Sequence, residues 1–202
     1  MGAAFVLTGR AMAADPPFSH KLHLKVIPNC ARCHTAVGTS AQVTDNLRPA
    51  AAVCVKCHPQ GVTIPEPEHT AVATFSHAQH MKLGNVSKVI AGAIDRKTYL
   101  SPPGDIRRHL DTQNPCGACH RGLEESDAVS HAALPNMADC LVCHSKIDPP
   151  DSCSKCHAKS MELKPASHVE GFFSEHSSGK LNLDKTSCAV CHGKRFTCLG
   201  CH

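Results

Sequence analysis

The sequence predicts a mostly irregular fold with short α-helices and little β-structure, organised around something other than a hydrophobic core. Three observations lead to this class. The 202 residues include no Trp, one Tyr and six Phe, whereas a chain of this length normally buries more aromatic surface. The 14 Pro and 13 Gly interrupt regular structure. All 14 Cys lie in Cys-x-x-Cys-His motifs, of which there are seven.

Each motif places two thiols and an imidazole on one helical turn, because positions i, i+3 and i+4 share a face. This arrangement is typical of c-type haem attachment, in which both thiols become thioethers to the porphyrin and the histidine binds the iron. Zinc sites and redox disulfides also use Cys-x-x-Cys, but neither requires a histidine after every second cysteine. The sequence therefore predicts seven covalent haem c groups that form the core of the fold. The predicted attachment residues are Cys30, Cys33, Cys54, Cys57, Cys116, Cys119, Cys140, Cys143, Cys153, Cys156, Cys188, Cys191, Cys198 and Cys201, and the proximal iron ligands are His34, His58, His120, His144, His157, His192 and His202.

A second repeated element predicts the distal iron ligands. The pattern Phe-Ser-His-x-x-His occurs at 18–23 and again at 75–80, and its Ser-His core returns at 130–131 and 167–168. Serine caps a helix start, histidines at i and i+3 project from one side, and imidazole suits haem iron. Nine histidines lie outside the motifs, which is enough for seven bis-histidine irons. The predicted distal ligands are His20, His23, His77, His80, His131, His168 and His176, with His69 and His109 as the alternatives, of which His109 could replace any one of the seven.

The N-terminal residues 1–14 resemble the remnant of a secretion signal. Residues 3–7 are apolar, and Ala11-Met12-Ala13 is a small-residue cleavage pattern. Covalent haem attachment takes place outside the cytoplasm, so export is expected on independent grounds. We predict a periplasmic location, with the extracellular or outer surface as the alternative.

The motif spacing divides the remainder of the chain into three segments. Residues 15–70 carry the first two motifs, residues 71–160 an insert and the next three, and residues 161–202 the last two. Only five residues separate the sixth and seventh motifs. This short link predicts a close haem pair at one end of the series of seven haems.

The insert, at 84–108, contains neither Cys nor His. We predict a strand or hairpin for Val86–Ile94 paired with Thr98–Leu100. The insert is interpreted as a clasp or docking element or, in the interpretation that we favour, as a structural cover over haem edges.

The formal net charge of +4 does not indicate nucleic-acid binding, because haem propionates would offset it and no aromatic-and-basic patch accompanies the Lys and Arg residues. The apolar N-terminal run is too short to span a membrane.

In the order of its motifs, the chain from Phe18 to about His157 resembles the class III multihaem cytochromes c, the small trihaem and tetrahaem kind. The segment from His168 to His176, ahead of Cys188, is similar to a distal-histidine segment of several larger multihaem cytochromes. In the class III family the first histidine of the Phe-Ser-His-x-x-His element binds the first haem and the second binds another haem. The resemblance implies those roles for His20 and His23, and by repeat for His77 and His80. The seven haems and the long insert depart from the family pattern.

The resemblance implies bis-histidine haems of low potential and electron transfer between redox partners, rather than catalysis. The partners would be redox proteins such as other cytochromes or a membrane quinone oxidoreductase. Two alternatives stay open. One is a multihaem oxidoreductase of the nitrite, hydroxylamine or tetrathionate type, with one open haem. The other is a structural subunit of an extracellular cytochrome filament or of a membrane redox complex.

Overall fold

The computed structural model describes residues 18–45, 47–63, 72–130, 133–144, 153–161, 163, 168, 170–178, 188 and 190. The predicted signal remnant at 1–14, His69, His131 and the residues from Cys191 to His202 lie outside the described part of the chain. The predicted close pair of the sixth and seventh haems therefore remains a prediction.

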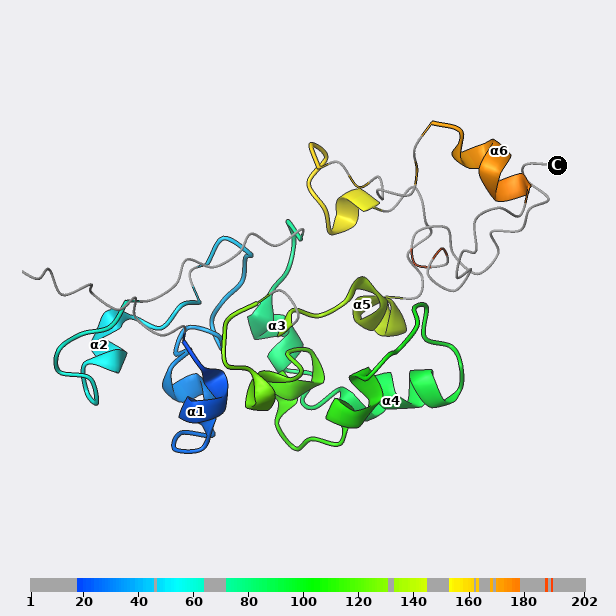
Figure 1. Ribbon diagram of the computed structural model, residues 1–202. Coiled ribbons are helices and arrows are strands. Elements are labelled where there is room, and N and C mark those ends of the chain that lie inside the picture. Colours follow the sequence, from blue (N-terminus) through cyan, green and yellow to red (C-terminus); the bar gives the residue numbers. More distant parts are fainter. Residues whose placement is uncertain are drawn as a thin grey trace, which may run out of the picture.

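Short helices separated by irregular segments make up the described chain, and none of the described residues forms a strand (Figure 1). The predicted class, mostly irregular with short helices, is confirmed at this level. The α-helices are α1 His20–Leu24, α2 Ala51–Cys54, α3 His77–Met81, α4 Ser87–Asp95, α5 Met137–Cys143 and α6 Phe172–Ser177. The 3-10 helices are η1 Cys30–Arg32, η2 Ile106–Leu110, η3 Pro115–Ala118, η4 Leu123–Glu125 and η6 Cys153–Lys155.

The strand predicted for Val86–Ile94 is wrong, because this segment forms the helix α4. Asn85 orders the start of the helix: its side-chain oxygen accepts from the Ser87 amide at 3.0 Å and its amide donates to the Thr112 carbonyl at 2.6 Å. The buried residues of α4 recur at helical spacing, and packing of this face overrides the preference of Val and Ile for strands. These buried residues are Ser87, Ile90, Ala91 and Ala93.

A small hydrophobic core lies between the insert and α5. Val86, Ile94, Ile106, Val142 and Val190 are half-buried against it, so a residue of the sixth motif also contacts this core. The insert is therefore a structural element with a packed interior. The buried members of this cluster are Ile90, Ala91, Ala93, Tyr99, Leu110 and Ala138.

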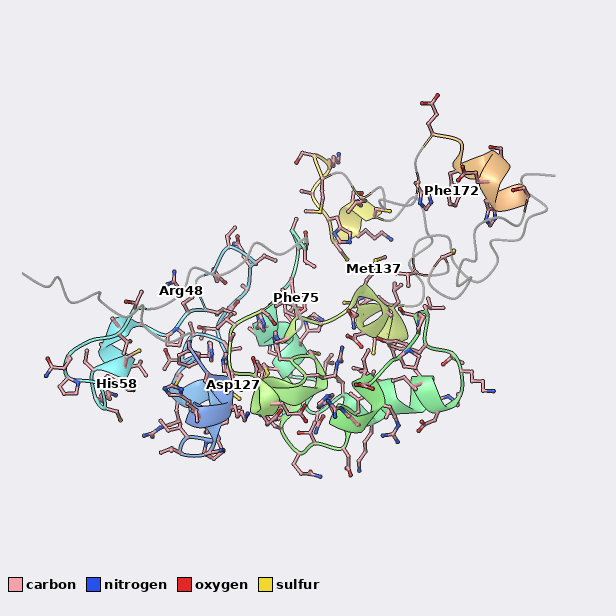
Figure 2. All side chains as sticks on the ribbon, viewed as in Figure 1. Arg48, His58, Phe75, Asp127, Met137 and Phe172 are labelled. Atoms are coloured by element: carbon pink, nitrogen blue, oxygen red, sulfur yellow. The ribbon has the colours of Figure 1, made fainter. Side chains whose placement is uncertain are left out.

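The described N-terminal part, residues 18–63, has no comparable core. Its buried residues are two serines, Ser19 and Ser40. Its helix α1 lies against η4, and the Ser40 carbonyl accepts from the amide of Ala78 in α3. Figure 2 shows Asp127, which follows η4, beside α1.

None of the described helices is long and apolar enough to cross a membrane.

Candidate functional site

The five Cys-x-x-Cys-His motifs that the structure describes in full form single helical turns, as the sequence predicts. In all five described motifs the histidine amide donates to the carbonyl of the first cysteine, four residues earlier. This hydrogen bond brings the start and end of each motif onto one face. The distances are 2.9 Å for His34, 2.9 Å for His58, 2.8 Å for His120, 2.9 Å for His144 and 2.9 Å for His157.

Four motif histidines each face one histidine from outside the motifs. The ring centroids of His20 and His34 are 6.4 Å apart at 13°, and those of His77 and His120 are 6.3 Å apart at 12°. The other two pairs are more tilted. They are His23 with His58 at 6.2 Å and 45°, and His80 with His144 at 6.3 Å and 47°.

The same pairing of histidines with motifs occurs in two parts of the chain. The first histidine of each Phe-Ser-His-x-x-His element faces the first motif that follows it, and the second faces the next motif. Residues 18–58 therefore form one unit with two imidazole pairs, here called the first module. Residues 75–144 form a second unit, the second module. The two motifs of each module are separated by the same 19 residues.

The spacing of the paired rings fits an iron atom between them. Two metal–imidazole bonds of about 2 Å each, added to about 1.1 Å from each nitrogen to its ring centre, require centroids about 6.2 Å apart. All four pairs lie within 0.2 Å of that value. Two imidazoles together with the two thiols of a motif are the donor set of a six-coordinate c-type haem.

Backbone carbonyls hold the rings in the tautomer that a metal requires. The Nδ1 of His34 donates to the Leu47 carbonyl at 2.7 Å, and that of His120 donates to the Ala133 carbonyl at 2.9 Å. Because the ring proton is on Nδ1, the Nε2 lone pair is free for a metal, which is the usual arrangement of metal-binding histidines. The acceptor lies 13 residues after the histidine in both modules.

The distal histidines have an equivalent support. His23 donates from Nδ1 to the Ser19 carbonyl, and His80 donates to the Ser76 carbonyl, each at 2.8 Å. His20 differs, because its buried Nδ1 has no hydrogen-bond partner.

Burial favours the neutral form of the ligand candidates. It is the largest cause that lowers the pKa of His20, His77 and His120, and neighbouring histidines lower these pKa values further in each case. Burial likewise raises the pKa of Cys116 and Cys119. Neutral imidazoles are suited to coordinate a metal, and protonated thiols are poor ligands for zinc. Within the described residues, no three His, Cys, Asp or Glu side chains gather as a metal cluster.

One phenylalanine packs against the two histidines of each Phe-Ser-His-x-x-His element. Phe18 stacks on His23 with centroids 4.5 Å apart and meets His20 edge-on at 4.9 Å. Phe75 repeats both contacts, at 4.3 Å to His80 and 4.8 Å to His77. The sequence shows both phenylalanines as part of the repeat. It does not predict their contacts, because helical spacing does not state which histidine ring the preceding phenylalanine packs against.

A buried polar network links the two motifs of the second module. Arg121, directly after His120, forms an ion pair with Asp139, directly before Cys140; both side chains are less than a tenth exposed. Arg121 also donates to the Ala118 carbonyl at 2.7 Å. Tyr99 of the insert donates to Asp139 at 2.9 Å, and burial is the largest cause that raises the pKa of its hydroxyl. Sequence reasoning missed this network because its three side chains are distant in the chain.

Other predicted ligands lie apart from these pairs. His168 and His176 both stack on Phe172, with ring centroids 4.6 and 5.4 Å from its own. His109 accepts a hydrogen bond from Arg108 at 3.0 Å. The fifth motif lies beside the start of the second module, where the Cys156 carbonyl accepts from the amides of Ala73 and Thr74.

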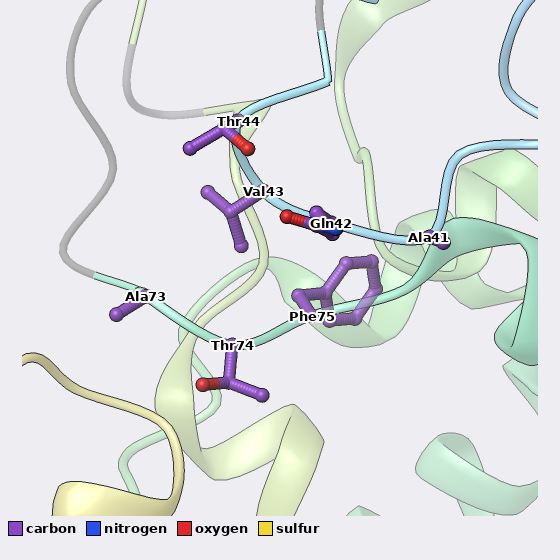
Figure 3. Close-up of a pocket in the computed structure, with 7 residues that line it drawn as sticks. All are labelled: Ala41, Gln42, Val43, Thr44, Ala73, Thr74 and Phe75. Atoms are coloured by element: carbon purple, nitrogen blue, oxygen red, sulfur yellow. The ribbon is translucent and has the colours of Figure 1, made fainter.

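A pocket of about 250 Å³ lies between residues 41–44 and 73–75, with Phe75 on its wall (Figure 3). Its lining contains no acidic, basic, histidine or cysteine side chain. This pocket therefore offers no side chain for acid–base chemistry, and no base lines it to activate the hydroxyls of Thr44 and Thr74.

Comparison of the chain with protein-family models, with curated proteins and with solved structures gives no match.

Proposed function

We propose that this chain is an exported electron-transfer protein that carries seven covalent c-type haems, in the manner of the class III cytochromes that its motifs resemble. The observation that carries the proposal is the set of four imidazole pairs at 6.2–6.4 Å. Each pair joins the histidine of a haem-attachment motif to a histidine outside it. A chain with no role for a bound metal has no reason to repeat this spacing four times.

The residues of each site have separate tasks. The two cysteines tether the group, the motif histidine and its partner hold the iron from both sides, and the carbonyls of Leu47 and Ala133 fix the proximal rings. When bound, haem supplies a one-electron couple whose potential depends on axial ligands, burial and hydrogen bonds. Two imidazoles per iron leave no coordination position for a substrate and favour low potentials. This is the ligand set of a carrier rather than that of an enzyme.

The redox partners follow from the expected location. Covalent haem attachment outside the cytoplasm places donor and acceptor there, in the periplasm or at the outer surface. Other cytochromes and a membrane quinone oxidoreductase are the partner classes proposed. An open iron at the fifth, sixth or seventh motif would instead favour the oxidoreductase alternative.

Two measurements on the purified protein test the proposal. The intact mass after acid denaturation should equal that of the exported chain plus seven haems, because the thioethers survive denaturation; four haems or fewer would contradict the proposal. The ferric protein should show low-spin signals from all irons. Rapid carbon monoxide binding to the reduced protein would reveal an open iron and would favour the enzyme.

A further inference from the structure

The two modules exchange equivalent contacts at the starts of their histidine helices. The amide of Lys21, in the first turn of α1, donates to the Ser126 carbonyl of the second module at 3.0 Å. The amide of Ala78, in the first turn of α3, donates to the Ser40 carbonyl of the first module at 2.9 Å. Both donors lie at the second position of their helix, where an isolated helix leaves the amide without a partner.

The capping serines repeat the exchange. The Ser19 hydroxyl reaches the Ser126 carbonyl at 3.3 Å, and the Ser76 hydroxyl reaches the Ser40 carbonyl at 3.2 Å. The acceptors are also equivalent in sequence, because Ser40 lies six residues after the first motif histidine and Ser126 six residues after the third. Each module therefore donates to the other the same hydrogen bonds that it accepts from it, as two subunits do across a twofold axis.

Equivalent residues of the two modules meet between these contacts. Asn114 donates from its side chain to the Cys30 sulfur at 3.3 Å, and its side-chain oxygen accepts from the Cys116 amide at 3.0 Å. Asn114 therefore links Cys30 of the first module to Cys116 of the second. Cys30 and Cys116 are the first cysteines of the first and third motifs, and residues at the same position of two related units meet only near the axis that relates them.

We propose that the first and third haem sites are direct neighbours across this junction, so that the sites follow one another in space in the order second, first, third, fourth. This order rests on the proposed function. It places the second site, with His58, at an outer end of the four. Figure 2 shows His58 at the edge of the described chain that is far from Met137 of α5. In the order of the chain, by contrast, the second site would lie between the first and the third.

The junction itself is tested on the unaltered, haem-loaded protein by amide hydrogen exchange. The Lys21 and Ala78 amides should exchange at least tenfold more slowly than unprotected amides of the same sequence, because their acceptors belong to the other module. Exchange of either amide at the unprotected rate would overturn the inference.

The order is tested with two variants of α1. Methionine is a weaker donor than histidine and raises the potential of its haem, so His20→Met makes the first haem the first to be reduced, and His23→Met does the same for the second. Each variant is poised so that only the altered haem is ferrous, and the haem methyl NMR signals of the remaining ferric haems are compared with the fully oxidised spectrum. Loss of paramagnetism at one haem shifts the signals of its neighbours.

In His20→Met the signals of the second and third haems should both shift. In His23→Met, the matched control, those of the first haem should shift, and those of the third should shift at least threefold less than in His20→Met. An equal or smaller response of the third haem in His20→Met would overturn the proposed order, as would an unchanged potential for the first haem. A mass that lacks most of the haems would instead refute the proposed function.

Discussion

The first and second modules present the same imidazole pairs on very different supports. Ring spacings agree within 0.1 Å between corresponding pairs, as do both phenylalanine contacts within 0.2 Å. Yet the buried hydrophobic residues of the described chain lie between Ile90 and Leu141, and the described residues of the first module bury only two serines. The spacing of the histidine pairs therefore depends on short local motifs. The hydrophobic core around α4 is specific to the second module.

The insert explains the difference. Six residues separate His23 from the next motif, whereas 35 separate His80 from the motif that follows it. The additional residues supply α4 and Tyr99, which meet α5 and Asp139. At the positions of Arg121 and Asp139 the first module has Thr35 and Val53. The second module thus has a buried ion pair between its two Cys-x-x-Cys-His motifs, and the first module has uncharged residues at the equivalent positions.

The largest expected effect comes from breaking that ion pair. Asp139→Asn leaves Arg121 buried without its counter-ion and should destabilise the second module by about 3–5 kcal/mol. The measurement is denaturant unfolding followed by amide exchange in α4. The double variant Arg121→Met/Asp139→Asn removes both charges and should recover much of the loss. Equal destabilisation by the double variant would mean that the charge pair is not the cause.

The same variants sharpen the comparison through the reduction potentials. An unpaired positive charge stabilises the ferrous state, so Asp139→Asn should raise the potentials of the third and fourth haems, whereas Arg121→Met should lower them. The first and second haems, which lack the pair, are internal controls. General loosening of the module would change the reduction potentials of both variants in the same direction. Shifts of opposite sign therefore identify an electrostatic effect.

Truncating the core should affect the second module alone. Ile90→Ala removes a side chain that is 3 % exposed and should cost about 2–5 kcal/mol. Val55→Ala, in the first module, changes a residue that is 45 % exposed, and its cost should stay below about 0.5 kcal/mol. Module-resolved hydrogen exchange measures both. Comparable losses would show that the first module depends on packing that its exposure does not indicate.

The capping serines should respond almost equally. Ser19 accepts from the Leu22 amide at 3.2 Å and Ser76 from the Gln79 amide at 3.3 Å, so each Ser→Ala change should cost about 1 kcal/mol. Ser19→Ala should cost slightly more, because this hydroxyl also lies 3.1 Å from Asp127. Thermal unfolding of the two variants checks this. A large difference between the stability losses of the two variants would show that the two serine caps are not equivalent.

Acid should produce the smallest effect, and chiefly at α1. The hydrogen bond from Lys21, followed by that from Ser19, holds the pKa of Asp127 below its ordinary value. The contribution of this contact is therefore complete above about pH 3.9, the unfolded value, and is lost as the pH falls through the folded value. Exchange of the Lys21 amide should accelerate in that range, and Asp127→Asn should abolish the change. Because Asp127 is exposed, salt should weaken the effect.

Local patterns were sufficient to predict much of the candidate site. The motif turns, the serine caps of α1 and α3, and the choice of His20, His23, His77 and His80 all depend on residues within four positions of one another. Such contacts are determined by helix geometry once the segment is helical. The strand predicted at Val86–Ile94 failed for the opposite reason, since burial of one face against α5 outweighed the preference of its β-branched residues.

The sequence by itself determined how the cysteines and histidines are grouped into motifs, and it predicted that short helices would present them. Only the tertiary structure decided which motifs His23, His77 and His80 face. It also decided that Arg121 and Asp139 form a buried pair and that Asn114 joins Cys30 to the second module. The Lys21 amide and the Ser126 carbonyl are more than a hundred residues apart in the chain. Contacts at such separation depend on how the whole chain closes on itself, because no local periodicity relates the two positions.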